Sequence, residues 1–240
     1  MNEQFCRTEM QVGKDALKKL QSAKVAVFGV GGVGGYVVEA LARCGIGSFD
    51  IFDNDVICAS NLNRQIIALH STLGQHKVDV CKRRIEDINP NAKVTAHKMF
   101  YLPENADSIN LADYDYIIDA VDTITAKLEL VCRANAAGVP IISSMGAANK
   151  LNPAAFLVSD IYKTSVCPVA RVMRRELKKR GIDKLKVVFS KEQPLSPIAP
   201  AVAESAPQTK RQTPSSNAFV PAAAGLVIAA EVFKDIANKK

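Results

Sequence analysis

The segment 25–39, VAVFGVGGVGGYVVE, constrains the fold more than any other part of the chain. An apolar run, 25–28, leads directly into a glycine-rich turn, 29–34, and an apolar helical segment, 36–41, follows without interruption. A buried strand followed by G-x-G-x-x-G and a helix is typical of nucleotide-binding units. The free N–H groups at the start of such a helix face the phosphate. The segment therefore predicts a nucleotide site, although it does not specify the nucleotide.

The glycines of this turn have separate predicted roles. Gly29 permits the tight turn, Gly31 lets a phosphate approach the backbone, and Gly34 allows the helix to pack closely on the strand. Gly32 belongs to the same phosphate-binding turn. Glycine-rich turns also occur for packing reasons alone, but the flanking strand and helix favour nucleotide binding.

A second predicted strand, 48–53, brings an acidic residue to the same site. It ends at Asp53, about 20 residues after the glycine turn, where a parallel sheet presents a carboxylate to the ribose hydroxyls. The alternative is a carboxylate that only caps a turn. Asp55 is either a second acid of the site or ordinary loop polarity.

Two basic residues after this strand suit phosphate binding. Asn61 and Arg64 belong to a polar cluster, NLNRQ, and the planar guanidinium of Arg64 can bind a phosphate through two hydrogen bonds. The cluster could equally be a plain N-cap of a helical run that ends at residue 69. Lys77 falls in the first turn of a helix predicted over 77–88, where the dipole disfavours a cation that lacks an anionic partner. That mismatch suggests a functional lysine.

Strands and helices alternate from residue 24 to residue 146. Asp119 and Asp122 end a strand predicted over 114–121, and they join Gly29 and Asp53 at the carboxyl ends of the strands, where such sheets bind ligands. The alternation predicts an α/β fold: a Rossmann-like, mostly parallel sheet with helices on both faces. The other strands are predicted at 94–96, 141–144 and 155–160, and the other helices at 14–20, 123–137, 166–180 and 219–236.

The composition indicates a soluble cytoplasmic protein. With 240 residues and 48% hydrophobic content, the chain can build one substantial core. Its six cysteines form no C-x-x-C pair, which argues against structural zinc and a disulfide framework. The polar N-terminus lacks a signal-peptide core, and the longest apolar run, 218–230, is too short to span a bilayer.

Positive charge is concentrated in the helix predicted over 166–180. Lysine and arginine total 31 against 24 acidic residues, a formal net charge of +7. A solvated charged face is the usual explanation for such a helix, but contact with the phosphate backbone of RNA also suits it. The cations of this helix are Arg171, Arg174, Arg175, Lys178, Lys179 and Arg180.

The amino-acid composition changes twice in the C-terminal part of the chain. Residues 190–217 are rich in proline, serine and alanine, which predicts a mobile connection, either a passive linker or a loop that gates a substrate. A closing helix, 219–236, has Pro221 near its start. We therefore expect a nucleotide-binding domain over 1–150 and a C-terminal extension over 151–240 that packs on the same core.

The order of these motifs resembles that of the adenylating superfamily of ubiquitin-activating and sulfur-carrier-activating, ThiF-like enzymes. The resemblance rests on GVGGVG, Asp53, NLNRQ, GQHKV (74–78) and DAVD (119–122). It implies that the chain binds ATP and Mg²⁺. The matching positions are Gly29, Gly31, Gly34, Asp53, Asn61, Arg64, Lys77 and Asp122.

The resemblance also implies individual roles. In that superfamily the residues that match Arg64 and Lys77 contact the phosphates, and the residue that matches Asp122 helps to place magnesium. An N-terminal arginine that reaches into the neighbouring subunit's site would correspond to Arg7, which implies a homodimer. From the residues alone, Arg7 is a solvated surface arginine.

The second half resembles one branch, the tRNA threonylcarbamoyladenosine dehydratases. The resemblance implies that ATP adenylates the threonyl carboxylate of the modified adenosine, and that the ureido group then closes a ring and expels AMP. No catalytic cysteine is needed for this intramolecular step, and the basic helix would hold the tRNA. Cys167 departs from the branch, which has an acidic residue before the proline. The matching segments are 143–153, 160–164, 168–182 and 219–236.

Three other functions share parts of the pattern. An activator of a ubiquitin-like or sulfur-carrier protein would share the ATP site, although such activators generally carry two C-x-x-C pairs that this chain lacks. A nicotinamide-dependent oxidoreductase would leave Arg64, Lys77 and Asp122 without a role. A non-catalytic module would merely retain a nucleotide. The sequence specifies neither the ring form of the product, nor the set of tRNAs, nor a sulfur-relay partner.

Overall fold

A computed structural model describes residues 3–196, 198 and 214–239. It contains a seven-stranded sheet in the order β3-β2-β1-β4-β5-β7-β6. All neighbouring strands are parallel except β6 and β7, which are antiparallel. The predicted α/β fold with a mostly parallel sheet is confirmed. The strands are β1 (Lys24–Phe28), β2 (Ser48–Phe52), β3 (Lys93–His97), β4 (Tyr116–Asp119), β5 (Ile141–Ser144), β6 (Phe156–Asp160) and β7 (Lys186–Ser190).

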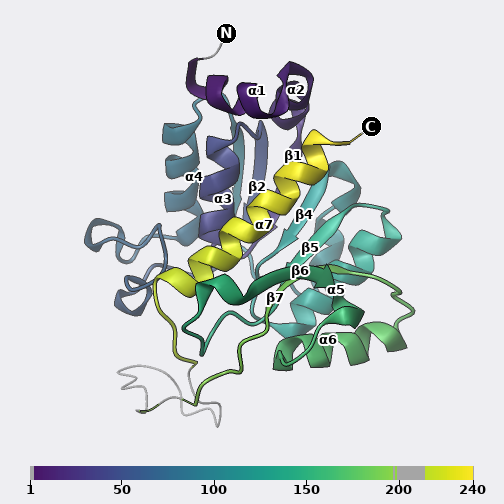
Figure 1. Cartoon of the computed structure of the whole chain (residues 1–240). Helices are drawn as coiled ribbons and strands as arrows, with labels where there is room; N and C mark the ends of the chain where they lie inside the picture. Colours follow the sequence, from purple (N-terminus) through teal and green to yellow (C-terminus); the bar gives the residue numbers. More distant parts are fainter. Residues whose placement is uncertain (1–2, 197, 199–213, 240) are drawn as a thin grey trace.

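Helices cover both faces of the sheet. α3, α4 and α7 lie on one face, and α5 and α6 lie on the other (Figure 1). The α-helices are α1 (Cys6–Val12), α2 (Lys14–Ser22), α3 (Gly34–Arg43), α4 (Lys77–Ile88), α5 (Ile124–Ala136), α6 (Pro168–Lys179) and α7 (Phe219–Ala237). Short 3₁₀ helices occur at Glu3–Phe5, Ala59–Asn61, His70–Thr72, Ala106–Ser108, Leu111–Asp113, Pro153–Ala155 and Ile161–Lys163. No helix in the described residues is long and apolar enough to cross a membrane.

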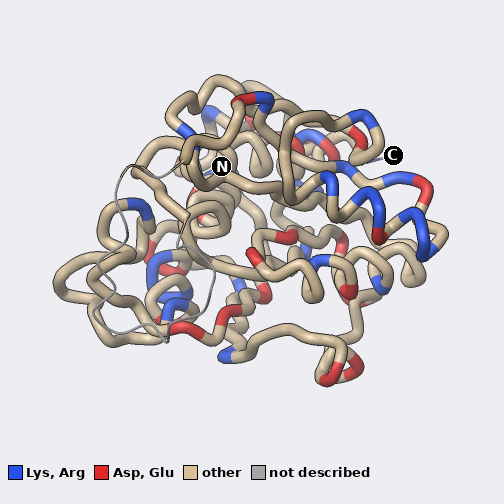
Figure 2. Tube along the Cα trace, turned by 90° about the horizontal axis from the view of Figure 1, so that it is seen from below, with Lys and Arg blue, Asp and Glu red and all other residues tan. Residues whose placement is uncertain are grey.

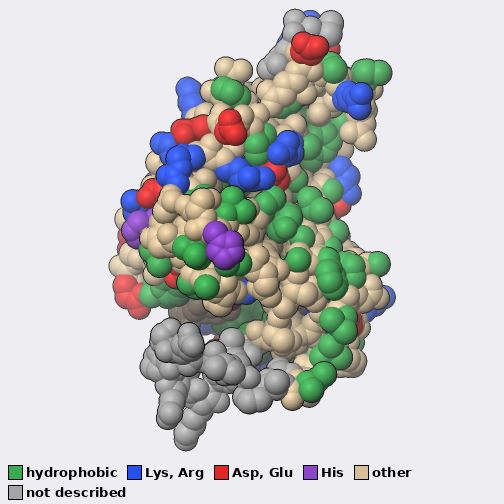
Figure 3. Space-filling model, turned by 90° about the vertical axis from the view of Figure 1, so that its left-hand side faces the viewer, with side chains coloured by type: hydrophobic (Ala, Val, Ile, Leu, Met, Phe, Trp, Pro, Cys, Tyr) green, Lys and Arg blue, Asp and Glu red, His purple; other side chains and the backbone are tan. Residues whose placement is uncertain are grey.

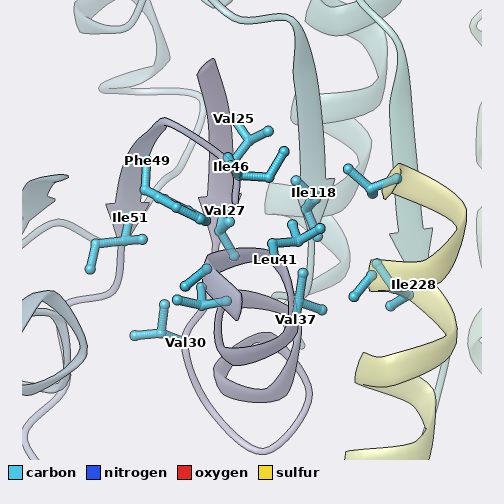
Figure 4. Close-up of a cluster of buried hydrophobic side chains, with 14 of the residues drawn as sticks. Val25, Val27, Val30, Val37, Leu41, Ile46, Phe49, Ile51, Ile118 and Ile228 are labelled. Atoms are coloured by element: carbon cyan, nitrogen blue, oxygen red, sulfur yellow. The ribbon is translucent and has the colours of Figure 1, made fainter. Parts of the chain in front are cut away.

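The alternation of side chains along β1 builds the two layers. Val25 and Val27 point into the layer that contains α3 and α7, where they meet Ile118 and Ile228 (Figure 4). Ala26 and Phe28, one residue later in each case, belong to the opposite layer beneath α5. Successive strand residues point to opposite faces, so a strand with helices on both sides is apolar at every position. This explains the uninterrupted apolar run before the glycine turn.

Two predicted boundaries were wrong at the N-terminal end and after β2. The first helix was predicted to start at residue 14, but the polar segment before it forms a further helix, α1, because Phe5 is buried at 2% exposure beside Gly45 and anchors it. The helical run considered between the polar cluster and residue 69 does not form, and the cluster itself contains only the 3₁₀ turn Ala59–Asn61. There the side chain of Asn61 accepts a hydrogen bond from the backbone N–H of Cys58, which holds a tight turn.

The strand β7 was not predicted. Its apolar core is short and flanked by lysine and serine, so its burial between β5 and β6 depends on long-range pairing. It continues the sheet past residue 150, while the predicted domain boundary there stays a prediction. The predicted mobile connection 190–217 is described only in part, because residues 197 and 199–213 lie outside the described residues.

The closing helix α7 connects the end of the chain to the glycine turn. It crosses α3 at Gly225, where an added Cβ would lie 2.5 Å from the carbonyl oxygen of Val33 and 2.9 Å from Cβ of Tyr36. At its first turn, Pro221 lies behind the glycine turn, with its Cβ 3.3 Å from where a Cβ on Gly32 would stand. The C-terminal helix thus supports the nucleotide turn directly.

We predict that Gly225→Ala destabilises the protein. The added methyl group meets backbone that cannot move freely, and such overpacking costs about 1–3 kcal/mol, which exceeds the gain of about 1 kcal/mol in helix propensity. Urea unfolding followed by circular dichroism should show a lower free energy of unfolding. Ala230→Ser, at an exposed position of the same helix, is the matched control and should change little. Unchanged or increased stability of Gly225→Ala would contradict the close crossing.

Candidate active site

A cavity of about 780 Å³ opens at the carboxyl ends of β1, β2, β4 and β5. Nine of the residues predicted for the site line it, whereas Gly34, Arg7 and the predicted RNA-binding cations do not. The nine residues are Gly29, Gly31, Gly32, Asp53, Asp55, Asn61, Arg64, Lys77 and Asp122.

The glycine turn has the geometry expected for a close strand–helix junction. Gly29 has φ +85°, and a Cβ there would lie 2.8 Å from the carbonyl oxygen of Ala120 on the neighbouring strand connection. A Cβ on Gly34 would lie 1.8 Å from the carbonyl oxygen of Gly29. No side chain fits at either position, so the tight turn at Gly29 and the close packing at Gly34 both require glycine.

Asp53 ties the end of β2 to the glycine turn. Its carboxylate accepts hydrogen bonds from the backbone N–H groups of Val30 and Asp55, each at 3.0 Å. Burial raises the pKa of Asp53 above its ordinary value, although the Lys77 ammonium and the two N–H donors act in the opposite direction. The carboxylate is therefore positioned at the turn before any nucleotide arrives.

Lys77 has the anionic partner that its position at a helix N-terminus requires. Its side chain is buried at the start of α4, with Nζ 2.6 Å from Oδ2 of Asp55 and 3.9 Å from Oδ1 of Asp53. Asp55 is itself exposed. The Lys77 ammonium can exchange its ion pair with Asp55 for one with a phosphate, because the carboxylate of Asp55 is exposed and can be solvated by water instead.

Arg64 keeps donors free beside the glycine turn. Its Nη1 donates to the carbonyl oxygen of Ser60 at 2.7 Å and to Oδ1 of Asn63 at 2.9 Å. Its Cγ lies 3.5 Å from where a Cβ on Gly32 would stand. Nε and Nη2 form no hydrogen bond within residues 3–196, 198 and 214–239, so half of the planar fork remains available to an anion.

The two aspartates after β4 have different environments. Asp119 is fully buried, and Lys127 Nζ lies 3.1 Å from both of its carboxylate oxygens and 2.7 Å from the carbonyl oxygen of Ser144. Asp122 is exposed at the cavity, accepts a hydrogen bond from Thr123 Oγ1 at 3.3 Å, and forms no ion pair in the described part of the chain. Asp119 therefore holds the loop together, and Asp122 presents an exposed carboxylate at the cavity.

The sequence interpretation missed an apolar slot next to Asp53. Phe28 and Phe52 stack with ring centroids 4.3 Å apart, and Tyr101 meets Phe28 edge-on at 4.9 Å. Together with Met99 and Phe100 they line one end of the cavity. Phe28, Phe52 and Tyr101 are buried and support this end, and a flat heteroaromatic ring could pack on the exposed Phe100 and the partly buried Met99. The only signal was the apolar residues of 99–101, which follow β3 at the same edge of the sheet.

The opposite end of the cavity is formed by the second half of the chain. The segment 144–150 lines it together with Cys167, the residue before α6. Cys167 is buried at 1% exposure, and its N–H donates to the carbonyl oxygen of Ser165 at 2.6 Å. The intervening Val166 has φ +64°, which is strained for a β-branched residue. Such strain typically occurs where a site requires a particular backbone direction.

The remaining predicted residues lie outside the cavity. Arg7 is exposed on α1, at the end of the sheet away from the cavity (Figure 1). Lys and Arg gather along α6 (Figure 2), where Glu176 binds Arg175, Lys179 and Arg180, and the three cations hold the pKa of Glu176 at about 2. Arg174 is directed at Thr164 and donates to its carbonyl oxygen and its hydroxyl group. The exposed cations of α6 are Arg171, Arg175, Lys178 and Lys179.

Comparison with known proteins identifies similar chains of nearly the same length. The chain is 45% identical over 242 residues to the tRNA threonylcarbamoyladenosine dehydratase of Bacillus subtilis, which covers 98% of this chain and 95% of that protein. It superposes on the Escherichia coli tRNA N6-threonylcarbamoyladenosine dehydratase in complex with AMP with a TM-score of 0.88, at 31% identity and with coverage of 98% of this chain and 94% of that one.

The same E. coli enzyme in complex with ATP gives a TM-score of 0.85 at 31% identity, with coverage of 98% and 93% of the two chains. The model of the ThiF family matches residues 5–240. The superfamily and branch that the motifs resembled are therefore confirmed, and the chain belongs to the ThiF family.

Proposed function

We propose that the protein is an ATP-dependent dehydratase that cyclises N6-threonylcarbamoyladenosine in tRNA. The observation that carries this proposal is the single cavity that joins a nucleotide-binding turn to a second, non-nucleotide end. The full-length similarity to enzymes of that name supports the choice of substrate.

Each part of ATP has a matching part of the cavity. The apolar end of the cavity at Met99 and Phe100 suits adenine, and Asp53 suits the ribose hydroxyls. The N–H groups of the glycine turn, the free fork of Arg64 and the ammonium of Lys77 suit the triphosphate.

Magnesium would be held by Asp122. The exposed, unpaired carboxylate fits a cation that is usually bound by one or two carboxylates together with substrate phosphates. When bound, Mg²⁺ neutralises phosphate charge. Lys77 would leave Asp55 for the phosphates, which also lowers the repulsion met by an incoming carboxylate.

The reaction then has two displacements. A threonyl carboxylate oxygen attacks the α-phosphorus of ATP, the bond to the β-phosphate breaks, and pyrophosphate leaves. An atom of the substrate's own ureido group attacks the acyl carbon of the adenylate, the ureido group gives up an N–H proton to water, and AMP leaves with the carboxylate oxygen. The net change in the nucleoside is the loss of one water. Because the second attack is intramolecular, positioning replaces a protein nucleophile.

The exposed face of α6 would bind the tRNA backbone. The helix begins at the cavity, since Cys167, Pro168 and Val169 line it, and its cations follow within the next turns. A tRNA bound along this face would therefore reach the cavity with its modified nucleoside.

A homodimer would complete the assembly. Exposed hydrophobic side chains gather on one side of the molecule (Figure 3), and α7 contributes Phe219 and Leu226, each 50% exposed. Arg7 belongs to α1 and does not line the cavity of its own chain, so a catalytic role for it would be exerted in the site of a second subunit.

We predict that Asp122→Asn lowers the rate of pyrophosphate release by roughly 10²–10³-fold. Without this carboxylate the site would hold Mg²⁺ weakly, so the negative charge of the transition state would lose its counter-ion. The assay uses ATP, Mg²⁺ and tRNA that carries threonylcarbamoyladenosine, and mass spectrometry of the nucleosides should show the loss of one water with the wild type only. Asp107→Asn, an exposed aspartate outside the cavity, is the control. Wild-type turnover with a small carrier protein that ends in Gly-Gly, and none with tRNA, would refute the proposal.

We predict that Lys77→Met weakens ATP binding and raises the pKa of Asp53 further. Lys77 is the nearest charge that lowers this pKa, so its removal leaves the burial effect unopposed. In the Asp53 titration, protonation should persist to a higher pH, which NMR of the carboxyl carbon measures directly. Lys82→Met, an exposed lysine of the same helix, should leave both quantities unchanged. An unshifted Asp53 titration would contradict the pairing.

We predict that Arg171→Glu with Arg175→Glu weakens tRNA binding at least tenfold and leaves ATP binding intact. Arg174 is unsuitable for this test because its hydrogen bonds to Thr164 support the fold. The slope of log affinity against log salt should decrease, since fewer counter-ions are released. Lys14→Glu with Lys18→Glu, on exposed positions of α2, is the charge-matched control. An equal loss of tRNA affinity in both double variants would show a general effect of net charge and would contradict a tRNA-binding face on α6.

A further inference from the structure

The second end of the cavity includes a buried lysine, Lys150, that forms no ion pair with any residue the structure describes. We propose that its ammonium binds the substrate's carboxylate and so restricts the reaction to tRNA whose adenosine already carries an acid group. This inference rests on the proposed function and assigns the residue that recognises the reacting group.

The charge of Lys150 is unbalanced. Lys150 is one of the residues that line the cavity, although it is only 3% exposed. Nζ forms one hydrogen bond, to the carbonyl oxygen of Glu192 at 3.0 Å, and an ammonium has three donors. No carboxylate lies within 4.0 Å of it in the described residues, whereas Lys77 and Lys127 in the same cavity each pair with an aspartate. A buried charge without a partner is costly, so this site favours an anion.

The nearest acid, Glu192, is already engaged. Its two carboxylate oxygens accept hydrogen bonds from the backbone N–H groups of Leu151 and Asn152, both at 2.9 Å. These two bonds hold the pKa of Glu192 below its ordinary value, and the charge of Lys150 lowers it further. Glu192 therefore stays ionised and orients the backbone of the segment, and its carboxylate oxygens form no ion pair within 4.0 Å of Nζ in the described residues.

The backbone of Lys150 is held from two sides. Its carbonyl oxygen accepts a hydrogen bond from Asn217 Nδ2 at 2.8 Å, and the preceding Asn149 exchanges hydrogen bonds with Ser215 and Leu195. Asn149 has φ +58°, a conformation that asparagine tolerates better than most residues. The ammonium is thus fixed before substrate arrives, which is the condition for strong recognition of a charge.

The order of the strands assigns this cation to the substrate side. β2, β1, β4 and β5 are neighbours in that order, so the cavity runs from the aromatic slot and Asp53 past the glycine turn to the segment after β5. Lys150 lies at the far end of this row, beyond the phosphate-binding turn. The start of α6 lines the same end without a side-chain cap, and its dipole adds positive potential. An acid that enters opposite the nucleotide meets Lys150.

The test compares wild type with Lys150→Met, Lys150→Arg and Lys93→Met, an exposed lysine at the start of β3, as the control. Binding is measured without ATP for one tRNA with threonylcarbamoyladenosine and for the same tRNA with plain adenosine at that position. Wild type should favour the modified tRNA by about 10- to 100-fold, the value of a hydrogen bond between charged groups. Lys150→Met should erase this preference, Lys150→Arg should keep part of it, and Lys93→Met should keep all of it.

Two further measurements make the result decisive. Affinity for ATP should be unchanged in Lys150→Met, and thermal unfolding should show a folded protein. A loss of ATP affinity with the tRNA preference intact would assign Lys150 to a phosphate and overturn the inference, as would a wild type that binds both tRNAs equally. If wild type releases no pyrophosphate with the modified tRNA, the proposed function itself fails. If it does and Lys150→Met matches it in kcat/KM, only this inference fails.

Discussion

The close approach of α3 to β1 determines the rest of the site. A Cβ added at Gly34, the first residue of α3, would lie 1.8 Å from the carbonyl oxygen of Gly29. Only glycine therefore fits at this position. Gly29, Gly31 and Gly32 of the turn line the cavity, and Asp53 secures the turn through the N–H of Val30. The same turn is supported from behind by α7, whose Gly225 lies against Val33. The first and last thirds of the chain therefore form one nucleotide platform.

The three lysines of the cavity differ in how their charges are paired. Lys127 neutralises Asp119 in the interior and serves the loop after β4. Lys77 is shared between Asp53 and Asp55, so an arriving phosphate can replace an exposed partner at low cost. Lys150 has no such partner among the residues described, and its only hydrogen bond is to a backbone carbonyl. In low-dielectric surroundings an unpaired cation attracts an anion strongly, whereas a paired one serves the fold.

The fold was predictable wherever burial imposes a regular pattern. The apolar run before Gly29 and the alternation of strands and helices to residue 146 follow from two covered sheet faces. β7 could not be predicted from KVVFS, since only pairing with β5 and β6 makes so short a run a strand. α1 escaped prediction because one buried side chain, Phe5, anchors an otherwise polar helix. In each case the missing information was a contact between residues distant in sequence.

By itself the sequence determined the fold class, the family, and the residues around the glycine turn. The steric limits on glycine can be read from a short stretch of sequence, and so can the spacing of Asp53, Arg64, Lys77 and Asp122. Only the tertiary structure decided which charges are paired. It buried Asp119 with Lys127, turned Arg174 toward Thr164, and gave Lys150 a backbone carbonyl but no ion pair within the described part of the chain. The physical reason is that a charge's role depends on its distance from other charges and from water, and the folded chain sets those distances between residues far apart in sequence.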